Sequence, residues 1–121
     1  MECRFYIEPN LEVYADAALL KRAVENLVGN AIKYAADGKY LDVLAQKTNE
    51  QKVCITFRNY GPEIPKAEQK TIVERFYREK KNGEKEGNGL GLAIVKQILE
   101  LHEGKIMAKS DEKQTDFLLV L

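Results

Sequence analysis

The sequence is poor in the residues that most often carry chemistry by themselves: it has one histidine, two cysteines and no tryptophan among 121 residues. Cys3 and Cys54 lack metal-ligand spacing and are too few for a disulfide framework, so a reducing compartment is expected. Excess charge of one sign is missing as well. Lysine plus arginine equals aspartate plus glutamate, at 19 each, which argues against nucleic acid or an anionic membrane as the partner.

Long hydrophobic runs are also missing. No apolar run approaches the roughly 18 residues that a bilayer-spanning helix needs, and no secretory signal is recognisable. The chain itself is therefore expected to be cytoplasmic, and the sequence does not tell whether a longer parent protein is membrane-anchored.

The sequence does have the apolar content of a folded domain, with 45% hydrophobic and 31% charged residues. Its length predicts a single domain over residues 1–121. Because helices and hairpins segregate along the chain, the expected class is α+β, with helices packed on one face of a mixed sheet. Alternating and helical apolar patterns predict strands over 3–8, 11–15, 40–48, 52–59, 105–110 and 115–121, and helices over 16–36, 66–76 and 90–102.

Local signals fix several of these boundaries. Asp16 stands where an N-cap belongs, and Gly104 follows the last predicted helix as its C-terminal stop. The charged, glycine-containing segment 78–89 has almost nothing apolar and is interpreted as a mobile surface loop, with a lid over 79–86.

The motif "GNGLGL", Gly87 to Leu92, stands at the start of a predicted helix. Glycines allow close backbone approach, and a helix N-terminus offers free N–H groups and a positive dipole end, so the motif predicts a phosphate site. A flexible hinge into a helix is the alternative. The spacing fits neither a dinucleotide fingerprint nor a P-loop.

A second polar stripe runs along the first predicted helix. Asn26 and Asn30 are four residues apart, and Lys33 and Tyr34 follow one turn later. An amide oxygen can ligate Mg²⁺ without repelling the phosphates that the ion bridges, and a lysine can meet phosphate oxygens. A solvated polar face, with the two asparagines bonded to each other, explains the same spacing equally well.

Four motifs together resemble a known family. "NLVGNAIKYA", "NYGPEIP", "ERFYR" and "GNGLGLAIVKQILELHEGKI" occur in the order found in the ATP-binding catalytic domain of sensor histidine kinases. That domain belongs to the ATPase superfamily of gyrase B, MutL and a heat-shock chaperone. The resemblance runs from about Asp16 to the C-terminus. It implies a two-layer sandwich in which three helices cover one face of a mixed sheet of about five strands (the Bergerat-type ATP-binding fold).

The resemblance also implies roles for individual residues, with ATP or ADP and Mg²⁺ as cofactors. Asn30 matches the Mg²⁺-ligating asparagine, and Asn59 falls where the family most often has an aspartate that accepts the adenine amino proton. Asn26, Lys33 and Arg78 match positions that assist phosphoryl transfer. The other positions that match nucleotide-lining residues of the family are Tyr34, Gly61, Ile64, Lys85, Gly87, Gly89, Leu90, Gly91 and Thr115.

Three departures from the family pattern affect the expected site. Asn59 keeps an amide oxygen for the adenine proton, but the bond loses its charge assistance. Glu63 replaces a glycine and adds negative charge near a pocket for an anionic ligand, and Gln114 stands where a glycine is usual.

The phosphoacceptor expected from the resemblance is missing. His102 is the only histidine, and its place in the last turn before Gly104 is explained by helix capping. The sole serine, Ser110, has no nucleophile motif around it. The chain is therefore interpreted as a fragment of a larger sensor kinase. Its partners would be the dimerisation and phosphoacceptor domain of the same kinase and a downstream response regulator, with the isolated domain monomeric.

Two other functions stay open on the sequence. A non-catalytic docking module would keep the fold but lose the nucleotide through the changes at Asn59 and Glu63. An anti-sigma-factor serine kinase would keep the fold and ATP but change the acceptor.

Overall fold

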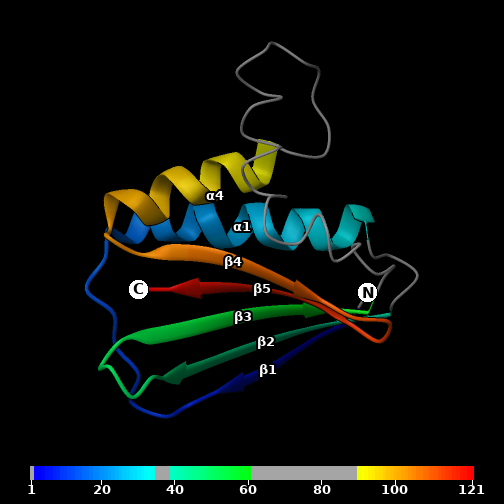
Figure 1. The fold of residues 1–121 in the computed structure, drawn as a ribbon, viewed down its shortest axis with the longest axis horizontal. Coiled ribbons are helices and arrows are strands. Elements are labelled where there is room, and N and C mark those ends of the chain that lie inside the picture. Colours follow the sequence, from blue (N-terminus) through cyan, green and yellow to red (C-terminus); the bar gives the residue numbers. More distant parts are fainter. Residues whose placement is uncertain (1, 35–38, 61–89) are drawn as a thin grey trace.

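The computed structural model describes residues 2–34, 39–60 and 90–121. In chain order the elements are β1 (Glu2–Ile7), α1 (Ala17–Tyr34), β2 (Tyr40–Lys47), β3 (Val53–Asn59), α4 (Leu90–Leu101), β4 (Lys105–Ser110) and β5 (Thr115–Val120). The helix predicted over 66–76 and the loop predicted over 78–89 lie outside the described residues. Figure 1 shows two layers, with α1 and α4 on one side and the sheet on the other.

The five strands form one mixed sheet in the order β1-β2-β3-β5-β4. β1 pairs with β2 in parallel, and the other three pairs are antiparallel. The two-layer α+β class with a mixed five-stranded sheet is thereby confirmed, and two helices are seen in the described part of the chain.

The strand predicted over 11–15 is wrong, because these residues form no strand. A parallel pair cannot be joined by a tight turn, so the chain must leave β1, cross to the helix layer and return as β2. Residues 8–16 are the first part of that crossover, which leaves Tyr14 fully exposed. The segment has an alternating apolar pattern, but no strand of the sheet pairs with it.

The core lies between the two layers. α1 and α4 pack against each other and against the inner face of the sheet. Helical spacing brings one apolar stripe of each helix onto the alternate strand positions that face it. The buried residues of this cluster are Ala23, Leu27, Ala31, Leu41, Val43, Phe57, Leu92, Val95, Ile98, Leu99 and Leu119.

Both helix ends that meet at one edge of this core have defined caps. The Asp16 carboxylate accepts a hydrogen bond from the Leu19 N–H at 3.0 Å, which confirms Asp16 as the N-cap of α1. At the end of α4 the Gly104 N–H bonds to the Leu99 carbonyl at 2.8 Å and the Glu103 N–H to the Glu100 carbonyl at 3.1 Å, which is a Schellman motif.

Gly104 is needed for a reason other than the one predicted. The left-handed residue of the motif is Glu103, with φ of 57°, and not the glycine. A Cβ atom at Gly104 would instead collide with the backbone carbonyl oxygen of Val120. Gly104 therefore permits the close approach of the helix end to β5.

Substitutions at these two neighbouring positions should change stability in opposite directions. Gly104→Ala should lower the free energy of unfolding by about 1–3 kcal/mol, because the added methyl group displaces the β5 backbone. Glu103→Gly should raise it by about 0.5–1 kcal/mol, because glycine adopts the left-handed conformation without strain. Urea unfolding of the two variants beside the wild type measures both effects, and the same sign for both would contradict this assignment.

Candidate functional site

Residues expected to bind nucleotide come together at one end of the molecule. α1 and α4 run in opposite directions, so the end of α1 and the start of α4 lie toward the end of the sheet where β3 stops and β5 starts (Figure 1). Asn59 is the last residue of β3 and Thr115 is the first of β5. Asn30 lies in the last turns of α1, which also contain the backbones of Lys33 and Tyr34.

Asn59 and Thr115 are direct partners in the sheet. They face each other in the antiparallel register of β3 and β5 and point to the inner, helix-covered face, like Phe57 and Leu119. Both are buried, with Asn59 8% and Thr115 3% exposed. The Thr115 hydroxyl shares a hydrogen bond of 2.6 Å with the hydroxyl of Ser110 on β4. A polar group pair is thus built into the end of an otherwise apolar inner face.

The start of α4 and the last turns of α1 lie toward the same end of the molecule as this pair. α4 begins at Leu90 and has no acidic residue in its first turn, so no side chain of its own offsets the positive end of its dipole. The Asn26 amide nitrogen donates to the Arg22 carbonyl at 2.8 Å and so lies along its own helix. The expected site residues outside the described part are Gly61, Ile64, Arg78, Lys85, Gly87 and Gly89.

A charged network that was not predicted from the sequence lies on the other face of the same strand ends. Asp42 on β2 is only 5% exposed. Its carboxylate accepts hydrogen bonds from Nε and Nη2 of Arg4, at 2.6 and 2.9 Å. It also accepts a hydrogen bond from the hydroxyl of Tyr60, at 2.5 Å. Arg4 also lies 4.0 Å from the centre of the Tyr40 ring. Asp42 therefore connects the edge strand β1 to the residue that follows Asn59.

These hydrogen bonds shift the pKa values of Asp42 and Tyr60 in opposite directions. The Arg4 guanidinium holds the pKa of Asp42 below its ordinary value of 3.8, in spite of burial, and the Tyr60 hydroxyl adds to that shift. The Asp42 carboxylate in turn raises the pKa of Tyr60, and burial raises it further. At neutral pH the network is therefore an ion pair with a neutral phenol as an additional donor.

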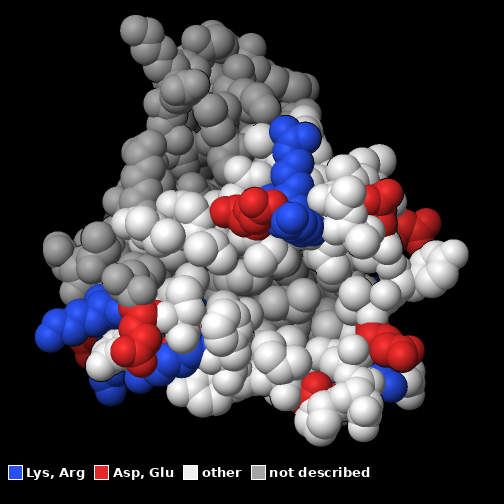
Figure 2. Space-filling view, turned by 180° about the vertical axis from the view of Figure 1, so that it is seen from behind, with Lys and Arg blue, Asp and Glu red and all other residues white. Residues whose placement is uncertain are grey.

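The network belongs to a row of alternating charges across the outer face of the sheet. The register aligns Arg4, Asp42, Arg58, Asp116 and Lys109 on β1, β2, β3, β5 and β4 in that order. Arg58 makes a second bidentate pair with Asp116, at 2.8 and 3.0 Å. Opposite charges directly across a ladder stabilise the pairing of the strands. Figure 2 shows another side of the molecule, seen from behind, where basic and acidic side chains also stand beside each other.

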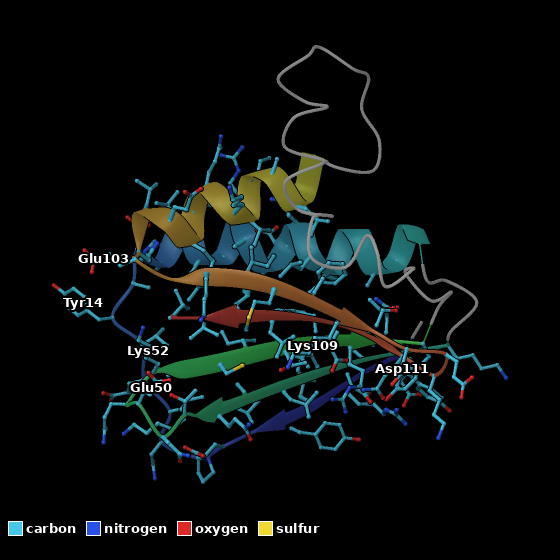
Figure 3. The ribbon with its side chains drawn as sticks, viewed as in Figure 1. Tyr14, Glu50, Lys52, Glu103, Lys109 and Asp111 are labelled. Carbon is cyan, nitrogen blue, oxygen red and sulfur yellow. The ribbon has the colours of Figure 1, made fainter. Side chains whose placement is uncertain are left out.

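The turn that follows this row is also fixed by a carboxylate. Asp111, between β4 and β5, accepts the N–H groups of Lys113 and Gln114 at 2.7 and 2.9 Å. These backbone bonds lower the pKa of Asp111. Figure 3 shows Asp111 at the end of the sheet opposite Glu50 and Lys52 of the β2–β3 turn. The strand ends that carry Asn59 and Thr115 are therefore stabilised both by the ion pairs on the outer face and by the hydrogen bonds in the β4–β5 turn.

Comparison with protein families decides the class of the chain. The model of histidine kinase-, DNA gyrase B-, and HSP90-like ATPases matches residues 15–121. The chain belongs to this family. The resemblance to the ATP-binding catalytic domain of sensor histidine kinases is confirmed.

Known relatives of this histidine kinase-like ATPase domain are sensor kinases. It is 40% identical over 98 residues to the adaptive-response sensory kinase SasA of Rippkaea orientalis, covering 81% of this chain and 25% of that protein. It is 42% identical over 93 residues to the histidine-protein kinase/phosphatase MprB of Mycobacterium leprae, covering 77% and 18%. The chain thus spans a quarter or less of these relatives.

A solved structure extends the likeness to the whole fold. The mycobacterial sensor histidine kinase MprB superposes with a TM-score of 0.79 at 30% identity, covering 99% of this chain and 80% of that one. The ATPase-type domain therefore includes β1, which precedes the matched residues of the family model.

The single histidine of this ATPase domain is engaged in structure. His102 Nε2 accepts the Asp16 N–H at 3.0 Å, and Nδ1 lies 2.8 Å from the Ile98 carbonyl. Because Nε2 is an acceptor here, Nδ1 is the nitrogen that donates to the Ile98 carbonyl. His102 ties the start of α1 to the end of α4, away from Asn59.

The described residues contain neither a candidate metal-binding cluster nor a membrane-spanning helix. Within 2–34, 39–60 and 90–121, no group of three or more histidine, cysteine, aspartate or glutamate residues is arranged to hold a metal ion. No helix in the same ranges is both long and apolar enough to cross a membrane.

The Asp42 network of this ATPase domain should give a defined acid dependence of stability. Because the pKa of folded Asp42 lies below 3.8, its contribution to folding is complete well above that pH and is lost as the pH falls through the folded-state pKa. Asp42→Asn should cost roughly 1–3 kcal/mol at neutral pH, and this gap to the wild type should begin to narrow as the pH falls below about 4.

Urea unfolding of both proteins from neutral pH to about pH 3 measures the gap. Glu50→Gln, which removes an exposed carboxylate at the β2–β3 turn, is the control and should show no such gap. A gap at Asp42→Asn that stays constant throughout the acid range would contradict the assigned ion pair.

Proposed function

We propose that this domain binds Mg·ATP and supplies the γ-phosphate for autophosphorylation of a histidine on a separate dimerisation domain of a two-component sensor kinase. The observation that carries the proposal is the buried pair Asn59 and Thr115, which lies at the sheet end toward which α1 ends and α4 starts. Membership of the ATPase family and the sensor-kinase relatives support the same function.

The polar residues at this end fit a nucleotide by their chemistry. Asn59 presents an amide, which can accept from the amino group of a purine, and Thr115 presents a hydroxyl. The Asn30 amide oxygen is a suitable ligand for Mg²⁺, which would neutralise charge on the phosphates during transfer. The N-terminal end of α4, with no acidic residue in its first turn, suits the phosphates themselves.

The remaining assignments follow the family pattern. Gly61, Ile64 and Tyr34 would line the base or ribose, and Asn26 would support Asn30. Cations would come from Lys33, Arg78 and Lys85, and the backbone of the glycine motif would enclose the phosphates, through Gly87, Gly89, Leu90 and Gly91. Phosphoryl transfer depends on positioning and charge neutralisation, so these residues provide what the protein must supply.

The phosphoacceptor is proposed to come from another domain. His102, the only histidine, has both ring nitrogens in structural hydrogen bonds. We therefore expect the chain alone to be a monomer that binds nucleotide with negligible turnover. The parent would be a larger sensor kinase, membrane-anchored with this domain in the cytoplasm, that passes the phosphate to a response regulator.

Calorimetric titration with ADP in the presence of Mg²⁺ tests the proposed site. We expect saturable binding in the micromolar range, weakened about tenfold or more by Asn59→Ala, which removes the base contact. Asn30→Asp should weaken binding similarly, because a carboxylate beside the phosphates adds repulsion, and chelation of Mg²⁺ with EDTA should reduce the wild-type affinity as well.

Asn49→Ala is the matched control, because this exposed asparagine lies in the β2–β3 turn at the opposite end of the sheet. It should leave the affinity unchanged. No detectable binding up to millimolar ADP would overturn the proposal and favour a docking module that has lost its nucleotide.

A further inference from the structure

Tyr60 is attached to the sheet by its side chain and not by the strand ladder. The last register pairs of β3 join Asn59 to Leu41 on one side and to Thr115 on the other. Tyr60 follows the strand, and its hydroxyl donates to Asp42 at 2.5 Å. Since successive side chains point to opposite faces, Asn59 faces the helices while Tyr60 reaches the outer face.

We propose that Asp42, held by Arg4, is a positioning residue for the nucleotide base, because it fixes Tyr60 and thereby the direction of the neighbouring Asn59 amide. This inference rests on the proposed function of Asn59. Asp42 lies on the outer face of the sheet and does not contact the nucleotide itself.

The arrangement of Asp42 suits such a role. Its carboxylate is oriented by the bidentate Arg4 pair, so the acceptor for Tyr60 has one fixed direction. The bond is charge-assisted and sits in a nearly buried position, where it is stronger than in water. A phenol held in this way restrains the peptide between Asn59 and Tyr60, which would otherwise fray as strand ends do.

Restraining that peptide should act on affinity. A side chain that is already aimed at its ligand loses less conformational entropy on binding. If the anchor is removed, the sheet still pairs with Asn59, but part of the ordering of the peptide that follows it must come from nucleotide binding. The expected cost is a modest loss in affinity of about three- to tenfold, with the contacts to phosphate unchanged.

The competing explanation is that the network only stabilises the sheet. In that case its loss lowers the unfolding midpoint but leaves the affinity of the folded protein as it is. The two explanations separate when affinity is measured well below the unfolding temperature and stability is measured independently.

The experiment compares Tyr60→Phe, Asp42→Asn and the double variant with the wild type. Affinity for ADP with Mg²⁺ is measured by calorimetry at least about 20 °C below each midpoint, and the midpoints come from thermal unfolding. We expect each single variant to bind ADP three- to tenfold more weakly. The double variant should be no weaker than the weaker single, because both act through one bond.

Two control variants are included. One removes a tyrosine hydroxyl outside the proposed anchor, and the other lowers stability at a site away from Asn59. Tyr6→Phe removes a hydroxyl from a half-exposed tyrosine two residues after Arg4, on the same face of β1. Val53→Ala destabilises the core at the start of β3, at the opposite end from Asn59. Both should bind ADP like the wild type, although the second lowers the midpoint.

The outcomes distinguish the inference from the function on which it rests. If the wild type does not bind ADP, the proposed function fails, and this inference fails with it. If the wild type binds and Tyr60→Phe binds equally well, the positioning role is overturned while the nucleotide site stands. Losses at Asp42 and Tyr60 that simply add would also overturn it, since Asp42 would then act by another route. Tyr60→Phe keeps the test decisive even if Asp42→Asn does not fold.

Discussion

A carboxylate with 5% exposure can remain ionised in a sheet only if its hydrogen bonds are satisfied, and Asp42 meets this condition through Arg4 and Tyr60. The requirement constrains three strands at once. On one side it holds β1, an edge strand that pairs only with β2, and on the other it anchors the chain just beyond Asn59. The row of alternating charge extends this constraint to Arg58 and Asp116 on β3 and β5. The inner face at the same level carries Asn59 and Thr115, so the two faces of these strand ends are organised together.

The helices complete the arrangement from the other layer. Because α1 and α4 are antiparallel, the C-terminal end of one and the N-terminal end of the other lie toward the same end of the sheet. The opposite ends are connected by the bond from the Asp16 N–H to His102 and closed by the Schellman motif at Glu103. One end of the molecule is therefore closed by structural caps, while the other has the Asn59 amide, the Thr115 and Ser110 hydroxyls and a positive helix terminus. That polarity suits a ligand that is apolar and aromatic at one end and anionic at the other.

Much of the fold follows from local sequence signals, and the exceptions have clear causes. β2 to β5 and the cap at Asp16 could be predicted because alternation and capping are local properties. The strand predicted over 11–15 was wrong because the parallel pairing of β1 with β2, which turns that segment into a crossover, is not visible in the segment itself. The Asp42 network was missed for a similar reason: a charged residue inside an apolar strand signals a buried bond, but its partners are 38 and 18 residues away. Asn59 and Thr115 were selected by family resemblance, and only the register made them neighbours.

Nucleotide is proposed to bind at the end of the sheet where Asn59 and Thr115 meet. Hydrogen–deuterium exchange of the domain, with and without ADP and Mg²⁺, tests it most directly, because it locates the ligand without any substitution. We expect slower exchange in the last turns of α1, at the end of β3 and at the start of β5, with the β2–β3 turn around Glu50 unchanged. Protection confined to the β2–β3 turn, or no protection at saturating ADP, would contradict it.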